Sequence, residues 1–304
     1  MTHLLTGIIP AVPTPMTADG NLHLDVIPDL VDRLVADGAS AAFVCGTTGE
    51  SSSLTPEERR RVLEAYMTAV DGRIPVIAHV GGDCLRTGAE LARHAEGLGV
   101  AAIAATPPHY FAAASTQTLL DCIAAITAGA PGTPYYHYHI PVLSGVAVKV
   151  AEVFAEAGDR IPTLAGVKYT DENLMDFRGC LTAAGGRYNC LGGRDEQLLG
   201  FLATGAHGAV GSTYTYAAPL FVRLCNAFRA GDLETAQQEQ DRAIELVRVL
   251  VRYGGLVAGK AIAGMVGPEM GPPRLPNRGL DADAQAALRR DLEAIGFFDW
   301  GRTP

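Results

Sequence analysis

The chain contains very little lysine. Of its 24 lysines and arginines only three are lysines, Lys149, Lys168 and Lys260. Arginine stays protonated and cannot act as an amine nucleophile, whereas a lysine in a desolvated site can lose its proton and attack a carbonyl carbon. A chain that uses arginine for nearly every cation has kept lysine where arginine cannot substitute. Lys168 stands out because it ends the apolar run Leu164-Ala165-Gly166-Val167-Lys168, which predicts a buried strand.

Other absences narrow the class of protein. The six cysteines form no C-x-x-C pair and match no zinc or disulfide framework, which favours reduced thiols in a cytoplasmic protein. The net charge of -9 gives no indication of a nucleic-acid or anionic-membrane partner. No apolar run reaches about 18 residues, and the N-terminal stretch lacks a basic start, so we expect neither a transmembrane helix nor a signal peptide.

The chain does contain a regular alternation of short apolar runs and longer amphipathic segments. The short runs are typical of strands that are buried on both faces of a parallel sheet. They cover residues 8–12, 41–44, 74–80, 100–105, 135–140, 163–168, 188–191 and 208–211. The amphipathic segments predict helices over residues 25–37, 56–70, 84–98, 115–129, 148–158, 172–184, 195–204 and 216–230.

Eight strand–helix units in about 230 residues predict an α/β fold of the (β/α)8 TIM-barrel type. A doubly wound sheet is the alternative, but no glycine-rich dinucleotide turn follows the first strand. Beyond residue 231 only helices are predicted, over 232–253, 256–266 and 281–295. We therefore expect a catalytic barrel over residues 1–230 and a C-terminal helical extension over 231–304 that packs on it.

Polar residues fall at the predicted C-terminal ends of five strands, where TIM barrels carry their active sites. The hydroxyls and N–H groups of the G-T-T-G-E turn would suit a carboxylate or a phosphate. Because strand ends converge on one mouth, we expect all of these residues to meet there. They are the turn Gly46-Thr47-Thr48-Gly49-Glu50, Tyr138, Lys168 with Thr170, the pair Asp195 and Glu196, and Ser212 with Thr213.

Each of these features alone admits a plainer interpretation. A strand-end lysine can extend its amine into solvent, and G-T-T-G is a common turn. Asp195 and Glu196 could instead cap the next helix. His137 and His139 alternate with Tyr138 and so face away from it, and without acidic ligands nearby they do not predict a metal site.

In this order and spacing, the segments resemble the pyruvate-dependent class I aldolase superfamily that includes dihydrodipicolinate synthase and N-acetylneuraminate lyase. The resemblance runs from Gly7 to about Pro276. It includes the opening Gly7…Pro10-Ala11…Thr14-Pro15, the G-T-T-G-E turn, the tyrosine on the fifth strand and Gly166-Val167-Lys168. The chain is most similar to the N-acetylneuraminate lyases, in residues 136–141, 195–199, 208–214 and 271–276. The stretch 141–145 lacks the arginine typical of the synthases, while His137, Arg194 and Thr215 depart from the lyase pattern and leave the sugar preference open.

The resemblance implies a Schiff-base-forming lyase that cleaves N-acetylneuraminate reversibly to N-acetylmannosamine and pyruvate, with no metal or organic cofactor. It implies that Lys168, Tyr138 and Thr47 are catalytic. The lysine would attack the substrate ketone, the tyrosine would relay a proton with help from neighbouring hydroxyls, and Thr47 and Thr48 would bind the adjacent carboxylate.

By the same resemblance, the sugar end of the site would be lined by Thr170, Gly193, Asp195, Glu196 and Ser212. Tyr110 would lie near a neighbour's site in a homotetramer. The nearest alternative is a pyruvate-dependent aldolase or dehydratase that acts on a 2-keto-3-deoxy sugar acid, with dihydrodipicolinate synthase less favoured. A metal-dependent aldolase barrel and a non-catalytic sugar-acid sensor are the remaining alternatives.

Overall fold

A computed structural model describes residues 5–301 of the chain. Eight parallel strands form one sheet in the order β1-β8-β7-β6-β5-β4-β3-β2. A parallel bridge between Ala11 and Phe43 brings the two edges together, and the Val12 N–H donates to the Phe43 carbonyl at 3.1 Å. The strands are β1 (Gly7–Pro10), β2 (Ala42–Val44), β3 (Val76–His79), β4 (Ala102–Ala105), β5 (Tyr135–His139), β6 (Leu164–Tyr169), β7 (Asn189–Gly192) and β8 (Gly208–Gly211). This nearly closed parallel barrel confirms the predicted (β/α)8 fold.

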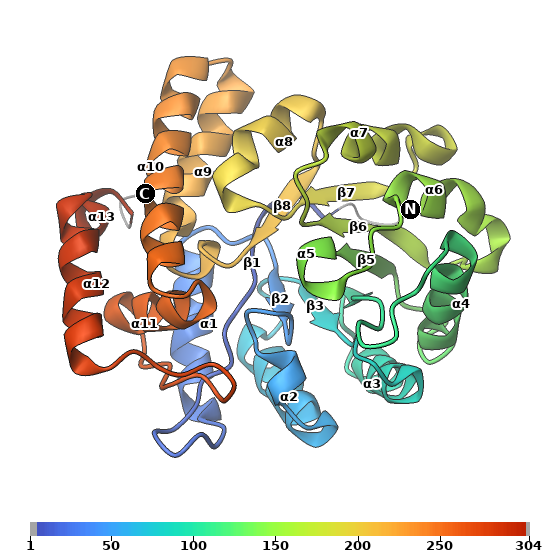
Figure 1. Ribbon diagram of the computed structural model, residues 1–304, viewed down its shortest axis with the longest axis horizontal. Coiled ribbons are helices and arrows are strands. Elements are labelled where there is room, and N and C mark those ends of the chain that lie inside the picture. Colours follow the sequence, from blue (N-terminus) through green and yellow to red (C-terminus); the bar gives the residue numbers. More distant parts are fainter. Residues whose placement is uncertain (1–4, 302–304) are drawn as a thin grey trace.

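Helices follow the strands and surround them (Figure 1). The predicted helices are present within a few residues of their expected ends. The structure adds two four-residue helices that the sequence pattern did not predict, α5 and α13. The helices are α1 (Ile27–Ala36), α2 (Pro56–Val70), α3 (Leu85–Gly97), α4 (Thr116–Thr127), α5 (Pro141–Ser144), α6 (Val150–Ala157), α7 (Leu174–Thr182), α8 (Leu198–Thr204), α9 (Tyr214–Ala230), α10 (Leu233–Arg252), α11 (Leu256–Val266), α12 (Ala282–Ala294) and α13 (Phe297–Trp300).

Helix α2 shows how local sequence sets an element's start. The Thr55 hydroxyl accepts the Glu58 N–H at 3.2 Å, and the Glu58 carboxylate accepts the Thr55 N–H at 2.9 Å. Together they form a capping box, with Pro56 at the first helical position. The helix therefore begins at Pro56, separated from the G-T-T-G-E turn by a short 3-10 helix over Ser51–Ser53.

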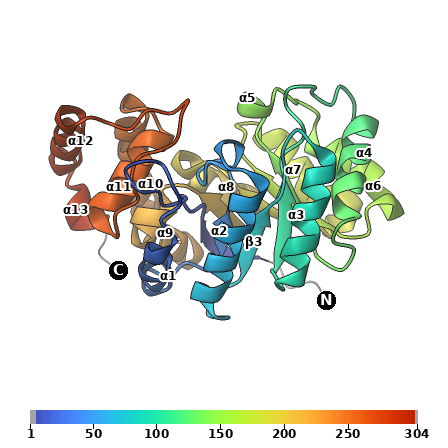
Figure 2. The same cartoon turned by 90° about the horizontal axis from the view of Figure 1, so that it is seen from below.

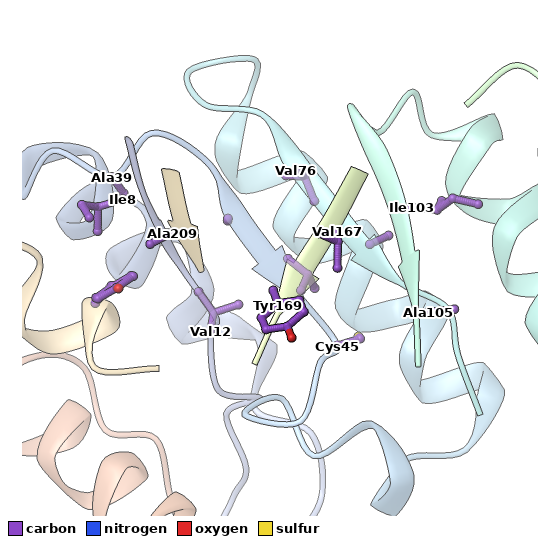
Figure 3. Close-up of a cluster of buried hydrophobic side chains, with 14 of the residues drawn as sticks. Ile8, Val12, Ala39, Cys45, Val76, Ile103, Ala105, Val167, Tyr169 and Ala209 are labelled. Carbon is purple, nitrogen blue, oxygen red and sulfur yellow. The ribbon is translucent and has the colours of Figure 1, made fainter. Parts of the chain in front are cut away.

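Alternation along each strand divides the apolar core into two layers. One layer lies between strands and helices, and Figure 3 shows part of it, including Ile8, Val167 and Tyr169. The other fills the barrel interior, where small side chains leave room for a few large rings. Its buried members are Ile9, Ala11, Ala41, Phe43, Ile77, Ala102, Ala104, Tyr136, Tyr138, Ile140, Leu191 and Val210. Tyr138 thus points into the barrel mouth.

The C-terminal helices gather on one side of the barrel, where α10 packs along α9 and α11 contacts both (Figures 1 and 2). Within residues 5–301, no single helix is long and apolar enough to cross a membrane; only α10 and α11 pass that test together, and they are bent by 115°. The helices beyond residue 231 reach the mouth of the barrel, since Leu256 and Lys260 of α11 line the same cavity as Lys168.

Candidate active site

A cavity of about 260 Å³ opens at the C-terminal ends of the strands. It brings together nine of the ten side chains or backbone positions that the sequence predicts for the site. They are Thr47, Thr48, Tyr138, Lys168, Thr170, Gly193, Asp195, Glu196 and Ser212. The tenth, Tyr110, lies outside this cavity on the loop after β4. The residue is 80% exposed, and its ring contacts that of Phe111.

Lys168 and Tyr138 are paired by strand register. They are directly opposite each other on the neighbouring parallel strands β5 and β6. The Lys168 Nζ lies 3.8 Å from the centroid of the Tyr138 ring and 4.8 Å from that of Phe43. The side chain is buried, with 5% of the residue exposed. Two aromatic faces and the barrel wall therefore keep most water from this amine, which is the setting that an amine nucleophile needs.

The Tyr138 hydroxyl lies 3.2 Å from the Thr47 Oγ1, so the G-T-T-G-E turn reaches the strand-five tyrosine. The turn is closed by the Glu50 N–H, which donates to the Thr47 carbonyl at 3.0 Å. The Thr14 hydroxyl donates to the Gly49 carbonyl at 2.7 Å and holds it from the β1 side. These contacts fix two hydroxyls and a set of backbone N–H groups beside the buried amine.

His79, which the sequence analysis did not single out, supports the Tyr138 ring. The two rings meet edge to face with centroids 5.8 Å apart. The Cys45 carbonyl lies 3.0 Å from His79 Nδ1, and the Thr106 N–H donates to Nε2 at 3.2 Å. Because Nε2 accepts, Nδ1 carries the proton and the ring is neutral. Burial, together with the cations of Arg59 and Lys168, holds the His79 pKa well below its usual range.

Asp195 is engaged inward at the start of the loop after β7. Its carboxylate accepts the Thr213 N–H at 3.0 Å and the Thr213 hydroxyl at 2.6 Å. A Cβ on Gly211 would lie 1.8 Å from Asp195 Oδ1, so this approach requires glycine. Asp195 therefore ties the end of β7 to the end of β8, and does not cap α8 through its side chain.

The remaining polar groups lie on the rim of the same cavity. A Cβ on Gly193 would lie 2.1 Å from the Thr170 Oγ1, so glycine lets these two strand ends meet. The Thr170 hydroxyl has no hydrogen-bond partner among the described residues. Arg194 donates to Glu196 Oε1 at 3.0 Å and pairs with Glu172 at the same distance. The rim thus holds a buried hydroxyl without a partner in the described part of the chain, and the Arg194 cation between two carboxylates.

The side chains on the two faces of β5 separate as alternation predicts. Tyr138 faces the barrel interior, whereas His137 and His139 pack outside it, with His139 against Tyr169 at 4.9 Å between ring centroids. His139 Nε2 lies 3.6 Å from Asp171. Within residues 5–301, no group of three or more histidines, cysteines or acidic residues is arranged to hold a metal ion.

Sequence reasoning missed a second buried lysine in the cavity wall. Lys260 of α11 donates to Glu50 Oε1 at 2.7 Å, and both side chains are almost completely buried. Burial lowers the pKa of Lys260, and the Glu50 carboxylate opposes that shift. The sequence analysis names Lys260 as one of the three lysines but does not assign it to the site. Its partner Glu50 lies 210 positions away, and no local pattern connects the two residues.

Asp195 should leave a measurable signature in the pH dependence of stability. Burial raises the pKa of this carboxyl to about 6, from an ordinary value of 3.8. Between these values the folded protein keeps a proton that the unfolded chain releases, so the free energy of unfolding falls as pH rises through this window. Relative to the Asp195→Asn variant, we expect the wild type to lose about 2 kcal/mol between pH 4 and pH 7.

Urea denaturation of both proteins across this pH range measures the difference. The variant Asp25→Asn makes the same exchange at an exposed position and is the matched control for the substitution itself. A constant difference between the wild type and Asp195→Asn from pH 4 to pH 7 would contradict the expectation.

Comparison with known proteins places this arrangement in a family. Residues 4–295 match the model of the dihydrodipicolinate synthetase family. The N-acetylneuraminate lyase of Gallus gallus is 38% identical over 300 residues, which are 97% of each chain. The solved structure of Proteus mirabilis N-acetylneuraminate lyase has 38% identity and a TM-score of 0.94, and the match covers 97% of this chain and 100% of that one.

A third similar protein has a catalytic lysine. The Ruminococcus gnavus sialic acid aldolase, solved as a catalytic lysine mutant, is 31% identical with a TM-score of 0.91, and 98% of each chain is covered. The resemblance that the motifs indicate is therefore confirmed over nearly the whole chain. The chain belongs to the dihydrodipicolinate synthetase family, and within that family it is similar to the N-acetylneuraminate lyases.

Proposed function

We propose that the protein is a class I pyruvate aldolase that cleaves N-acetylneuraminate reversibly to N-acetylmannosamine and pyruvate through a Schiff base on Lys168. One observation carries the proposal. A buried lysine amine lies 3.8 Å from the ring of Tyr138, whose hydroxyl meets the Thr47 hydroxyl at 3.2 Å in a single cavity. Amine, proton relay and carboxylate site are thereby within reach of one small substrate.

The reaction would begin when the neutral Lys168 amine attacks the ketone carbon of the open-chain sugar acid. Loss of water forms a protonated Schiff base, which is a better electron sink than the ketone. The bond between the third and fourth substrate carbons then breaks, and its electron pair moves into an enamine on Lys168. Protonation of the enamine at carbon three and hydrolysis return pyruvate and the free amine.

Tyr138 would take the proton from the hydroxyl on carbon four, whose oxygen becomes the aldehyde oxygen of the released N-acetylmannosamine, and would return that proton to the enamine. A phenol ordinarily keeps its own proton at neutral pH, so it needs a partner that receives that proton while the oxygen accepts another. The Thr47 hydroxyl at 3.2 Å is suited to this relay, together with the substrate carboxylate. Thr47, Thr48 and the N–H groups of their turn would bind that carboxylate.

The rim residues would receive the polyol end of the substrate. The free Thr170 hydroxyl and the Glu196 carboxylate are apt partners for substrate hydroxyls, each of which loses affinity when it is left unpaired. Arg194 is the one arginine among the described residues of the cavity, and Glu172 and Glu196 hold it. Arg194 follows β7, whereas the arginine typical of the synthases would follow Tyr138 of β5. This difference favours a sugar acid over the synthase substrate.

The assembly and the compartment belong to the same proposal. A homotetramer in the cytoplasm, with Tyr110 near a neighbouring copy's site, would cover an aromatic surface that is otherwise open to water. Tyr110 and Phe111 are 80% and 86% exposed on one loop. Large exposed aromatics on adjacent positions are typical of surfaces that meet another chain.

Borohydride reduction in the presence of pyruvate tests the covalent step. A permanent mass increase is expected on the peptide that contains Lys168. Absence of an adduct, or an adduct on Lys149 or Lys260, would contradict the mechanism.

Pyruvate release from N-acetylneuraminate, compared with release from 2-keto-3-deoxy sugar acids, tests the substrate. We expect kcat/KM to be at least about 10-fold higher for N-acetylneuraminate, because its longer polyol would reach more of the polar rim groups. A preference for the deoxy acids would favour the second candidate. Activity that persists with a chelator would exclude a metal-dependent aldolase.

A further inference from the structure

A buried ion pair joins the C-terminal helices to the G-T-T-G-E turn. Lys260 Nζ donates to Glu50 Oε1 at 2.7 Å and to the Pro272 carbonyl at 3.0 Å. The second Glu50 oxygen accepts the Arg274 N–H at 2.8 Å. The side chains of Lys260 and Glu50 are 2% and 0% exposed. The carboxylate is therefore fully paired, and all of its described partners come from residues beyond 259.

The pair lies directly behind the turn that presents Thr47 and Thr48. Glu50 is the last residue of that turn, and its N–H closes the turn on the Thr47 carbonyl. Its backbone is in the left-handed region, with φ of 55°, a conformation that a glutamate keeps only when its surroundings enforce it. Lys260 lines the same cavity as Thr47, Thr48 and Lys168. The backbone of the turn is thus held through the Glu50 side chain.

The charges of the pair matter as much as its geometry. A buried carboxylate without its cation is strongly destabilising, and it would also oppose any second anion brought close to it. A substrate carboxylate at Thr47 and Thr48 is such an anion. Lys260 cancels the charge of Glu50 at that place, so the turn can offer its hydroxyls and N–H groups to an anion without a fixed negative charge behind them.

We propose that Glu50 and Lys260 are positioning residues for the substrate carboxylate, and that helix α11 thereby sets the pyruvate affinity of the barrel. The proposal rests on the proposed function. It assigns the two buried lysines of the cavity to separate tasks. Lys168, against two aromatic rings, is the nucleophile, and Lys260, held by a carboxylate and a carbonyl, is a fixed counter-charge.

The test is the pyruvate concentration that gives half-maximal borohydride trapping on Lys168. In Lys260→Met we expect this concentration to rise about 10-fold or more, because an uncompensated charge within about 10 Å at an effective dielectric constant of about 20 has an effect of this size. The extent of trapping at saturating pyruvate should stay close to that of the wild type. Lys149→Met removes an exposed lysine by the same substitution and should leave both quantities unchanged.

The double variant Glu50→Gln/Lys260→Met separates charge from packing. It removes both charges and keeps an oxygen that can accept the Arg274 N–H. Its half-maximal concentration should lie between those of the wild type and Lys260→Met, since no lone carboxylate remains. A double variant as weak as Lys260→Met would contradict the role of charge.

Three further results would overturn the inference. They are an unchanged half-maximal concentration in Lys260→Met, a loss of maximal trapping at unchanged affinity, and an adduct on Lys260. If circular dichroism shows that Lys260→Met does not fold, the double variant alone provides the test. Its half-maximal pyruvate concentration should then exceed that of the wild type by about 3-fold or more. An absence of trapping in the wild type would instead refute the proposed function, so the two failures are distinguishable.

Discussion

Lys168→Arg is expected to abolish turnover, with kcat lowered by about 10⁴-fold or more. The guanidinium keeps the positive charge beside the Tyr138 and Phe43 rings but cannot form a Schiff base. The covalent step is then lost as a whole, while the carboxylate site stays in place. Pyruvate release from N-acetylneuraminate measures the effect, and mass spectrometry after borohydride treatment should find no adduct on the variant.

Lys149→Arg is the matched control, because it makes the same exchange at an exposed lysine beside Glu152. It should retain wild-type turnover. Full activity in Lys168→Arg would remove the Schiff base from the mechanism. Measurable activity with an adduct at another lysine would assign the nucleophile elsewhere.

Tyr138→Phe is expected to lower kcat by about 10³-fold while the pyruvate adduct on Lys168 still forms. The ring that contacts the lysine amine remains, but the hydroxyl that meets Thr47 is gone, and proton transfer by a positioned group contributes 10²- to 10⁴-fold. The readout is therefore a split between turnover and trapping. Wild-type turnover in Tyr138→Phe would show that another group moves the proton.

Tyr136→Phe provides the comparison for this change. Tyr136 lies two residues earlier on the same face of β5, and its hydroxyl donates to Asn189 deep in the barrel at 2.8 Å. Loss of that hydrogen bond should cost stability, by about 1 kcal/mol, and leave kcat within a few-fold of the wild type. Equal losses of turnover in the two variants would contradict a specific role for the Tyr138 hydroxyl.

The barrel could be predicted because parallel strands that are buried on both faces consist of short apolar runs in the sequence. The run that ends at Lys168 became β6, and the strand continues by one residue, through Tyr169. Helices α5 and α13 were not predicted, because four residues show too little periodicity to distinguish a helix from a turn. The first residues of α8 and α9 differ from the predicted ones by two or three positions. Neither helix has a side-chain cap that would mark its start in the sequence.

The site could be predicted as far as it is local. Thr47 and Asp195 follow their strands, and Tyr138 and Lys168 lie one residue before the ends of theirs, so the fold alone brings them together. The partner of Lys260 could not be predicted, because Glu50 is reached only through the packing of α11 against the barrel mouth. The inward hydrogen bonds of Asp195 to Thr213 also depend on the close approach of two strand ends.

The in-register placement of Lys168 and Tyr138 on adjacent strands has a consequence for how such an enzyme can change over evolutionary time. The proposed reacting pair is held by the hydrogen-bonded register of two barrel strands, while Arg194 and Glu196 lie in the segment that follows β7. Loops accept substitutions that a strand ladder does not. Substrate range can therefore drift through the rim while the bond-breaking chemistry is inherited intact, so a neutral change at Arg194 is a shorter route to a new sugar acid than any change within the barrel.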